Sequence, residues 1–555
     1  MDHQHPKLLS SQLFHNHRQV DVTLFCDFLK WKDIGSNRSN RGSGISSISQ
    51  TARGHAVQVC EIVAVHRTHV SDQTKATKHL QQNPYAFTVF YVRRMTQHQW
   101  RCSDITFHCA HQELCERWIQ AINDQLSLQT NRPKSLLVYI NPYGGKKQGM
   151  QLYDQKVAPL FSRACISTDV IVTERANHAR DHLKSEANLD KYDGVVCVGG
   201  DGMFSEILHG LVSKTQTDHG VDPNQPNANL VPCSLRIGII PAGSTDCICF
   251  ATVGTNDPVT SALHIIIGDC QPMDVCSVHH NNTFLRYSVS LLGYGFYGDV
   301  LNDSETKRWL GPARYDLSGV KTFLTHNYYE GTVSFVPAED DGGNPRDKEQ
   351  CRAGCRVCQR KTSLKAPRSD VPGEKETCDT GSETWTEIRG KFIAINAATM
   401  SCASPRSPKG LSPSAHLADG TADLILVRKC SRLDFFKHLL RHTNKDDQFD
   451  HSFVEVHRVR KFRFQPRYQE TMSLEDLKKL GLSPVGSRTS TYQYDSYACS
   501  HWTCDGEILP HAAIQVSVQC QLITLFARGI EEEQQCAPFQ DQTLLLEAGP
   551  HQSVD

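Results

Sequence analysis

The sequence predicts an α/β protein whose central part is a parallel sheet covered by helices. After Pro133, four short apolar runs alternate with segments of helical length, at residues 135–141, 167–173, 194–200 and 235–243. Three of these runs end in loops of glycine and other small residues. Strands that alternate with helices are typical of a doubly wound parallel sheet, and ligands bind beyond the carboxyl ends of such strands.

The first 130 residues predict a separate, mainly β domain. Residues 55–65, 85–94 and 103–110 are rich in β-branched and aromatic side chains, and residues 112–129 carry one apolar stripe that includes Trp118. Short strands closed by one amphipathic helix resemble a pleckstrin-homology domain, expected at residues 1–127. The resemblance implies a membrane-targeting role through phosphoinositide headgroups, whereas a small β domain used only for packing or protein contacts stays an alternative. The basic residues proposed to contact headgroups are Lys30, Lys32, Arg93 and Arg94.

Further elements follow from composition. The Ser- and Gly-rich residues 34–54 predict a loop within the first domain. We expect the α/β lobe at residues 132–275, because strand-like runs without many helices continue from 276 to 533 and predict a second, mainly β lobe. Residues 338–387 are charged and rich in Pro and Gly, which predicts a disordered insertion, and residues 534–555 predict a disordered polar tail.

Charge and hydropathy exclude several classes of function. The 555 residues include 59 Lys and Arg against 60 Asp and Glu, so no overall field favours nucleic acid, which is not an expected partner. The first residues lack a secretory pattern, and no apolar run approaches the roughly 18 residues of a membrane span. We therefore expect a cytoplasmic protein that contacts membranes peripherally and keeps most of its 22 cysteines reduced.

The most informative stretch is residues 194–214. A buried strand ends in Gly199, Gly200, Asp201 and Gly202, and a helix begins at once. Backbone N–H groups at such a junction can bind phosphate, and a carboxylate beside them suggests a metal ligand or a base for an attacking hydroxyl. A tight turn with a solvated aspartate is the alternative, because short glycine motifs also occur by chance.

Two other loops on the same sheet edge strengthen this interpretation. Residues 141–146 form a second glycine-rich turn, and residues 241–246 form a small hydroxylated loop. Together the three loops predict a cradle for nucleotide phosphates. It is neither a Walker A motif nor a protein-kinase set, because the chain has no GKS, GKT or DFG sequence.

These loops, with LLGYGFYGD at 291–299, RWLGPARYDLSG at 308–319 and CDGEILP at 504–510, resemble the catalytic fold of the diacylglycerol, sphingosine and ceramide kinase family over about residues 132–530. The resemblance implies an ATP-dependent lipid kinase that phosphorylates a primary hydroxyl, with ceramide as the expected acceptor. Sphingosine and diacylglycerol are alternatives within the class, and a non-catalytic lipid-binding scaffold is the alternative outside it. The resemblance also implies a location at the Golgi or plasma membrane.

The resemblance implies a role for each matching residue. Asp201 is expected to act as general base, and the loop of Gly199, Gly200, Asp201 and Gly202 is expected to face the lipid. Arg308 and Arg314 are the expected triphosphate cations, with exposed surface arginines as the alternative. Mg²⁺ is the expected cofactor, with Asp505 and Glu507 as its ligands. The full set expected to contact ATP is Asn141, Pro142, Tyr143, Gly144, Gly145, Thr173, Glu206, Gly243, Ser244, Thr245, Arg308, Arg314, Asp505, Gly506 and Glu507.

Three further motifs lie outside the loops. Asp419 and Asp423 form a DGxxD turn that resembles a structural cation site, although a solvated turn is favoured. Cys351, Cys355 and Cys358 have the spacing of a metal knuckle that Cys378 or a histidine could complete, although reduced loop cysteines are favoured because four ligands are usual for zinc. Residues 433–442 are basic and amphipathic, which suits calmodulin and Ca²⁺ regulation, although a core-facing helix is favoured.

Overall fold

The computed structural model describes residues 6–34, 54–68, 83–145, 147–311, 313–338, 344–365, 383–442, 447–467 and 499–532. The loop expected within residues 34–54 and the tail expected at 534–555 lie outside these ranges, apart from Ile34 and Gly54. No helix among the described residues is long and apolar enough to cross a membrane.

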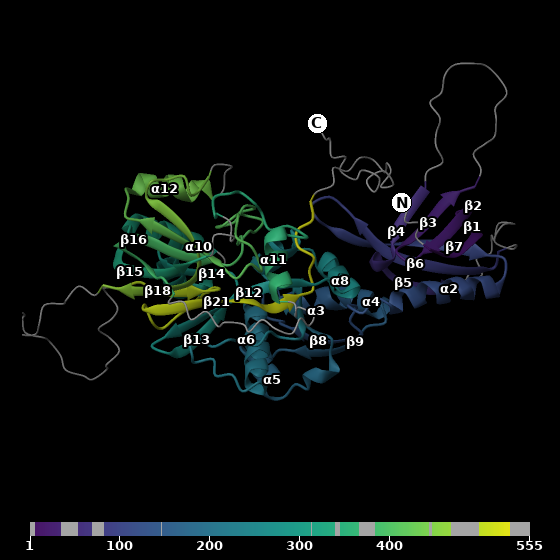
Figure 1. Cartoon of the computed structure of the whole chain (residues 1–555), viewed down its shortest axis with the longest axis horizontal. Helices are drawn as coiled ribbons and strands as arrows, with labels where there is room; N and C mark the ends of the chain where they lie inside the picture. The colour runs from purple at the N-terminus through teal and green to yellow at the C-terminus, as the bar shows by residue number, and fades with distance from the viewer. Residues whose placement is uncertain are drawn as a thin grey trace, which may run out of the picture.

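The N-terminal domain is a seven-stranded antiparallel sheet closed by one helix (Figure 1). The helix, α2, buries Cys115, Trp118 and Ile122 against the sheet, as its apolar stripe predicts. Residues 55–65 form two strands rather than one, because a 3-10 turn at Val59–Glu61 interrupts them. The elements are β1 (Lys7–His15), β2 (Arg18–Phe25), β3 (Phe28–Asp33), β4 (Gly54–Gln58), β5 (Ile62–Thr68), β6 (Tyr85–Arg94), β7 (Trp100–Cys109) and α2 (Gln112–Ser127).

The α/β lobe contains the four predicted strands, and they are parallel in the order β9-β8-β10-β11. Strand β10 is buried along its whole length, which explains its uninterrupted apolar sequence. The elements are β8 (Ser135–Ile140), α3 (Gly149–Leu152), a π-helical turn (Tyr153–Val157), α4 (Ala158–Arg163), β9 (Ser167–Val172), α5 (His178–Ser185), a 3-10 turn (Leu189–Lys191), β10 (Gly194–Gly199), α6 (Asp201–Asp218), β11 (Arg236–Pro241), α7 (Cys247–Val253) and α8 (Pro258–Ile267).

The second lobe is mainly β, and its sheet continues the sheet of the first lobe. Strand β21, the last one in the described part of the chain, pairs in parallel with β11 and antiparallel with β12 and β18, so it joins the two lobes across the middle of the molecule (Figure 1). The strands are β12 (Gln271–His280), β13 (Thr283–Ser288), β14 (Leu291–Gly295), β15 (Tyr329–Pro337), β16 (Thr386–Ala398), β17 (Ala422–Arg428), β18 (Val454–Pro466), β19 (Trp502–Cys504), β20 (Glu507–Ile508) and β21 (Ile514–Leu525). The helices are α9 (Phe296–Glu305), a 3-10 turn (Arg308–Leu310), α10 (Ala313–Thr325), α11 (Arg356–Lys365) and α12 (Arg432–Arg441).

The prediction of an unstructured insertion over residues 338–387 is wrong for its middle part. Residues 344–365 are ordered and contain helix α11, which follows the cysteine knuckle. Helix α11 consists mostly of polar residues. The loop before it packs on the rest of the protein, where the Ala353 N–H donates to the carbonyl of Ile530 at 2.9 Å. Tertiary contacts of this kind override a weak local propensity.

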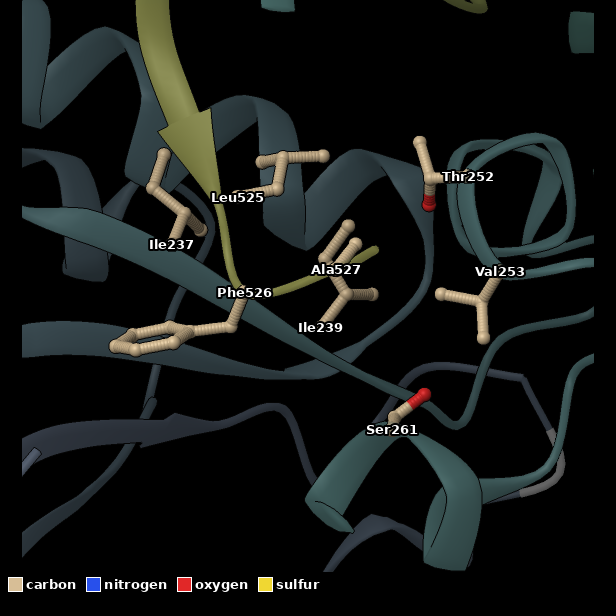
Figure 2. A pocket seen from close by; sticks show the side chains of 8 residues that line it. All are labelled: Ile237, Ile239, Thr252, Val253, Ser261, Leu525, Phe526 and Ala527. Carbon is tan, nitrogen blue, oxygen red and sulfur yellow. The ribbon is translucent and has the colours of Figure 1, made fainter. Parts of the chain in front are cut away.

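A small pocket marks the joint between the lobes (Figure 2). Leu525, Phe526 and Ala527, at the end of β21, lie beside β11, and helices α7 and α8 complete the lining. The lining hydroxyls are engaged, since Thr252 donates to the Ile248 carbonyl at 2.8 Å and Ser261 contacts Cys249 Sγ at 3.5 Å. The pocket is therefore part of the packing between the lobes and offers little to a polar ligand.

The N-terminal domain packs on the other two lobes through helix α8 and the chain after β21. The Trp100 ring packs against the ring of His264, with the centroids 3.8 Å apart and the planes tilted by 31°. Arg94 donates to Glu61 at 2.6 Å and to Glu531 at 2.9 Å. The prediction that Arg94 contacts lipid headgroups is therefore wrong, because its guanidinium is committed to this interface. Lys30 and Lys32 are exposed on β3. Contact of lipid headgroups with Lys30, Lys32 and Arg93 stays a prediction.

Candidate active site

Three loops meet at the carboxyl ends of β8, β10 and β11. A Cβ atom at Gly145 would lie 2.4 Å from the carbonyl oxygen of Ala242, and one at Gly243 would lie 2.6 Å from the Cα of Gly200. Contacts this close exclude any side chain, so glycine is required where the three loops touch. The three loops that the sequence analysis grouped into one cradle are therefore in direct contact with each other.

Asp201 lies at the first position of α6, directly after the loop. Its two carboxylate oxygens accept hydrogen bonds from the backbone N–H groups of Cys247 and Ile248, each at 3.0 Å. These donors form the N-terminus of α7, so the aspartate links the second and third loops. Burial raises the pKa of the Asp201 carboxyl, and the two backbone hydrogen bonds oppose the shift. The alternative of a freely solvated aspartate is wrong.

A second carboxylate, Asp246, lies near Asp201 at the start of α7. It was not among the predicted site residues. It has the left-handed backbone φ of 51° and accepts a hydrogen bond from the Gly243 N–H at 2.9 Å. Burial raises its pKa to about 6, and the charge of Asp201 adds to the effect. The sequence signal is the Asp that closes the loop PAGSTD.

The loop after β8 is shaped by Asn141. Its side-chain oxygen accepts hydrogen bonds from the N–H groups of Tyr143 at 2.9 Å and Gly144 at 3.0 Å, which folds residues 141–144, including Pro142, into a turn. Thr173 is buried beneath this turn and donates to the Ile140 carbonyl at 3.3 Å. The Tyr143 ring is 66% exposed and is free to cover a ligand.

The remaining loop positions are open. Ser244 and Thr245 are exposed, and a Cβ at Gly202 would meet no atom within 4 Å. Glu206 points to the start of α5, where the N–H groups of Asn177 and Ala179 donate to it. Burial raises its pKa, and its second oxygen, Oε2, is buried without a hydrogen-bond partner among the described residues. This orphaned acceptor is a place where a ligand hydroxyl could donate.

Asp505 closes the site from the β lobe, in the turn between β19 and β20 where Gly506 has a φ of 86°. Its carboxylate accepts five hydrogen bonds from residues 288–291, between β13 and β14. The donors are the hydroxyl of Ser288, the N–H of Val289, the N–H and hydroxyl of Ser290 and the N–H of Leu291, at 2.7–3.0 Å. Four of these donors share Oδ1, whereas Oδ2 accepts one hydrogen bond and keeps one lone pair, so Asp505 could offer at most one bond to a metal ion. The geometry favours a structural role for Asp505 over the predicted Mg²⁺ role.

Glu507 belongs to a polar bridge between the lobes. It is exposed and pairs at 2.6 Å with Arg286 of β13, which also donates to Ser205 of α6 at 3.0 Å. Sequence reasoning missed Arg286 because a lone arginine in a strand carries no motif. It is a cation that lies between α6 and the Asp505 turn.

Arg308 and Arg314 lie at the junction of α9 and α10. Both pair with the same carboxylate, Glu305, and the Arg314 guanidinium also covers the ring of Tyr315. The structure therefore brings the two predicted cations together, and their described partner is a carboxylate of the β lobe. Their contact with the triphosphate stays a prediction.

The DGxxD turn is buried, so its interpretation as a solvated turn is wrong. Asp423 accepts from Arg458 at 2.9 Å and from Ser412 at 2.6 Å, and both members of the ion pair are almost fully buried. Asp419 accepts from Thr421, and its Oδ2 is buried without a hydrogen-bond partner among the described residues. Helix α12, at the predicted calmodulin segment, buries Phe435 and His438, as the core-facing interpretation expects.

Comparisons with known proteins place this site in a family. Three family models match the chain in sequence: the ceramide kinase PH domain at residues 9–122, the diacylglycerol kinase catalytic domain at 135–278 and the ceramide kinase C-terminal domain at 290–539. The chain is 55% identical to ceramide kinase from Homo sapiens, over 89% of this chain and 92% of that protein. It belongs to the ceramide kinase family. The ceramide kinase of Mus musculus is 54% identical over 87% of this chain and 91% of its own length.

A solved structure from Bacillus anthracis str. Sterne, named as a diacylglycerol kinase, covers 71% of this chain and 97% of its own, with 11% identity and a TM-score of 0.41. The family models agree with the fold class expected from sequence, a pleckstrin-homology domain followed by a catalytic domain of the diacylglycerol kinase type. For this ceramide kinase family member, the glycine loops fall within the match to the catalytic domain, and Arg308, Arg314 and Asp505 fall within the match to the C-terminal domain.

Proposed function

We propose that the protein transfers the γ-phosphoryl group of ATP to the primary hydroxyl of ceramide and forms ceramide 1-phosphate. The observation that carries the proposal is the convergence of three glycine loops on one buried carboxylate, Asp201, in a chain of the ceramide kinase family. Phosphoryl transfer needs positioning and charge stabilisation more than covalent chemistry, and this arrangement supplies both.

Asp201 is the proposed general base. Each of its oxygens uses one lone pair on a backbone N–H of α7, which leaves the other lone pair for the lipid hydroxyl. The two hydrogen bonds hold the carboxylate in one orientation. Burial raises its pKa towards the neutral range, where a general base is most effective. The carboxylate takes the hydroxyl proton as the oxygen attacks the γ-phosphorus, and ADP leaves.

The nucleotide is proposed to lie on the first and third loops. The residues proposed to line this position are Asn141, Pro142, Tyr143, Gly144, Gly145, Gly243, Ser244 and Thr245, with Thr173 and Glu206 proposed at its edge. Because Gly145 and Gly243 approach backbone atoms so closely, phosphate oxygens can reach N–H groups that no side chain shields. The exposed Tyr143 ring is suited to cover the adenosine part.

Magnesium is the proposed companion of ATP, and the acidic residues fit it in part. Asp201 lies close enough to Asp246 for its charge to raise the pKa of that carboxyl, and a divalent cation would relieve the repulsion between them. Asp246 has one described hydrogen bond, to Oδ1, so it offers more free lone pairs to a metal ion than Asp505, which accepts five hydrogen bonds. Bound Mg²⁺ would neutralise charge on the β- and γ-phosphates.

Membrane access is proposed from an apolar surface on the β lobe. Helices α10 and α12 lie side by side (Figure 1), with the rings of Phe323 and Phe436 5.9 Å apart. These two helices and the turn before α10 expose eight large apolar side chains, which soluble surfaces rarely gather. This apolar surface consists of Trp309, Tyr315, Leu317, Val320, Leu324, Leu433, Phe436 and Leu440.

We propose that this apolar surface contacts the bilayer while the pleckstrin-homology domain binds phosphoinositide headgroups, which places the protein peripherally on Golgi or plasma membranes from the cytoplasm. Calmodulin with Ca²⁺ is a proposed regulator, because it would take the same apolar side chains of α12. Sphingosine and diacylglycerol kinase activities remain the alternative within the class.

One assay tests the activity directly. Purified full-length protein is given radiolabelled ATP, Mg²⁺ and micelles of ceramide, sphingosine or diacylglycerol, and label is expected on ceramide. Label on sphingosine alone would contradict the acceptor, and no label on any lipid would favour a binding scaffold. Asp201→Asn is expected to lower the rate at least about a hundredfold, as loss of a general base does. The new amide nitrogen faces one of the two N–H groups of α7, which costs about 1–3 kcal/mol of stability, so the rate is measured well below the melting temperature of the variant. A near-normal rate would remove Asp201 from the role of base.

A further inference from the structure

A cluster of sulfur and nitrogen atoms lies outside the proposed active site, where the ordered part of the insertion meets the β lobe. Cys351, Cys355 and Cys358 come from the loop before α11 and from its first turn, and His416 comes from the segment before β17. One ligand atom from each of the four residues lies within 4.8 Å of all the others. His416 was not predictable as a partner, because it follows the knuckle by 58 residues, from 358 to 416.

The distances within this four-residue cluster match the edges of a metal tetrahedron. Zn–S bonds of about 2.3 Å and a Zn–N bond of about 2.0 Å place sulfur atoms about 3.8 Å apart and sulfur about 3.5 Å from nitrogen. In the structure, Cys351 Sγ and Cys358 Sγ are 3.7 Å apart, and Cys355 Sγ is 3.3 Å from Nδ1 of His416. The sulfur separation excludes a disulfide, whose bond is about 2.05 Å long.

The surroundings of His416 supply what a metal-bound imidazole needs on its far side. The side chain is 2% exposed, and its Nε2 is buried without a hydrogen-bond partner among the described residues. Asp419 lies three residues further along the chain, and its Oδ2 is also buried without a hydrogen-bond partner among the described residues. The charge of His416 lowers the pKa of Asp419, so the two groups interact electrostatically. A histidine that binds metal through one nitrogen usually donates from the other to a carboxylate or carbonyl. His416 Nε2 and Asp419 Oδ2 are not hydrogen-bonded in the structure, so we infer that Asp419 takes this role through a small movement of its side chain.

We propose that Cys351, Cys355, Cys358 and His416 bind one structural Zn²⁺ ion. Three thiolates and one imidazole are a closed set of four ligands, with no position left for water or substrate, and such sets are typical of structural zinc. Thiolates select soft or borderline metals over Mg²⁺ and Ca²⁺, so this site is chemically distinct from the proposed nucleotide site.

The proposed zinc would fix the joint between the lobes. Between the first two cysteines, the Ala353 N–H donates to Ile530, beyond β21, and Gln521 of β21 donates to the Ala418 carbonyl at 3.0 Å and to the Cys358 carbonyl at 3.4 Å. The metal would therefore tie the insertion to the strand that both lobes share. Its loss is expected to loosen the packing around β21, because the binding energy of structural zinc is folding energy.

The test is the metal content of the full-length protein purified without chelators from zinc-supplemented medium. We expect about one zinc per chain by inductively coupled plasma mass spectrometry, and at least about a tenfold lower content in Cys355→Ser and His416→Ala. Cys165→Ser, at an exposed thiol away from the cluster, is the matched control and should keep its zinc. His416→Cys keeps four ligands and should also retain the metal, which separates ligand loss from misfolding.

Replacement of the metal by Co²⁺ gives a second readout that does not depend on activity. Tetrahedral cobalt with three thiolates should show sulfur-to-cobalt charge-transfer absorption in the wild type and in Cys165→Ser, and this absorption should be lost in Cys355→Ser. Two results would overturn the proposal: wild-type protein without zinc after dialysis against zinc-containing buffer, or equal zinc in the wild type and in Cys355→Ser combined with His416→Ala.

Discussion

Asp505 offers the sharpest test of the site, because sequence and structure suggest different roles for it. In Asp505→Asn the side chain keeps its shape, and Oδ1 can still accept from the four donors that it now serves. The new amide nitrogen, however, faces the N–H of Val289, so one donor is left without an acceptor, which costs about 1–3 kcal/mol. The other four hydrogen bonds lose the strength that the negative charge gives them.

Together these losses are expected to lower the free energy of unfolding of the β lobe by about 4 kcal/mol. For a domain of this size that corresponds to a fall in melting temperature of roughly 10 °C, measurable by differential scanning fluorimetry. The matched control is Glu507→Gln in the same turn. Glu507 is 58% exposed and makes one surface ion pair, with Arg286, so its removal should cost less than about 1 kcal/mol.

The same variants decide whether Asp505 binds Mg²⁺. If the carboxylate is structural, Asp505→Asn melts early, and the Mg²⁺ concentration for half-maximal activity stays within about twofold of the wild type when measured well below the melting temperature. An unchanged melting temperature together with a Mg²⁺ requirement raised tenfold or more would refute this reasoning and restore Asp505 as a metal ligand.

Three further predictions concern other parts of the chain. Because the pKa of Asp246 is raised to about 6 in the folded state, this group stabilises the fold below its unfolded pKa near 4 and loses that contribution as the pH rises through 6. Asp246→Asn should therefore gain about 1 kcal/mol of stability relative to the wild type between pH 5 and pH 7 in urea unfolding, and a constant difference would contradict the shift. Arg94→Ala breaks the ion pairs with Glu61 and Glu531 and should lower the melting temperature by roughly 5 °C with unchanged vesicle binding. Lys32→Ala should instead weaken vesicle binding and leave the melting temperature unchanged. Trp309→Ser combined with Leu324→Ser should lower the rate on ceramide in vesicles about tenfold, whereas Leu128→Ser, at another exposed leucine, should leave it unchanged; equal rates would exclude the apolar surface from membrane contact.

Features of the α/β lobe that depend on local pattern could be predicted from sequence. The strand ends at Asn141, Gly199 and Pro241 follow from apolar runs that stop at small residues, and parallel strands bring such ends to one edge of the sheet. The stripe that includes Trp118 likewise specifies α2, because one side of a helix must be buried.

What sequence reasoning missed depends on partners that are distant along the chain. Asp505 meets donors at residues 288–291, and Arg94 meets Glu531, so neither role has a local signature. A turn such as DGxxD is usually solvated, and its burial here follows from the pairing of Asp423 with Arg458 on a neighbouring strand. Helix α11 was missed for the same reason, since it is polar and is held by contacts of the loop before it.

Strand β21 has a consequence for how the protein is made. Its residues Thr524 and Leu525 pair with Arg236 and Ile237, so the first lobe's sheet is completed by residues that leave the ribosome long after β11 has been made. Until then, one edge of β11 has no strand to pair with, and an unpaired edge is a template for association between chains. A nascent chain of this protein therefore depends on β21 to protect this edge, and a chain that stops before residue 514 would expose it permanently.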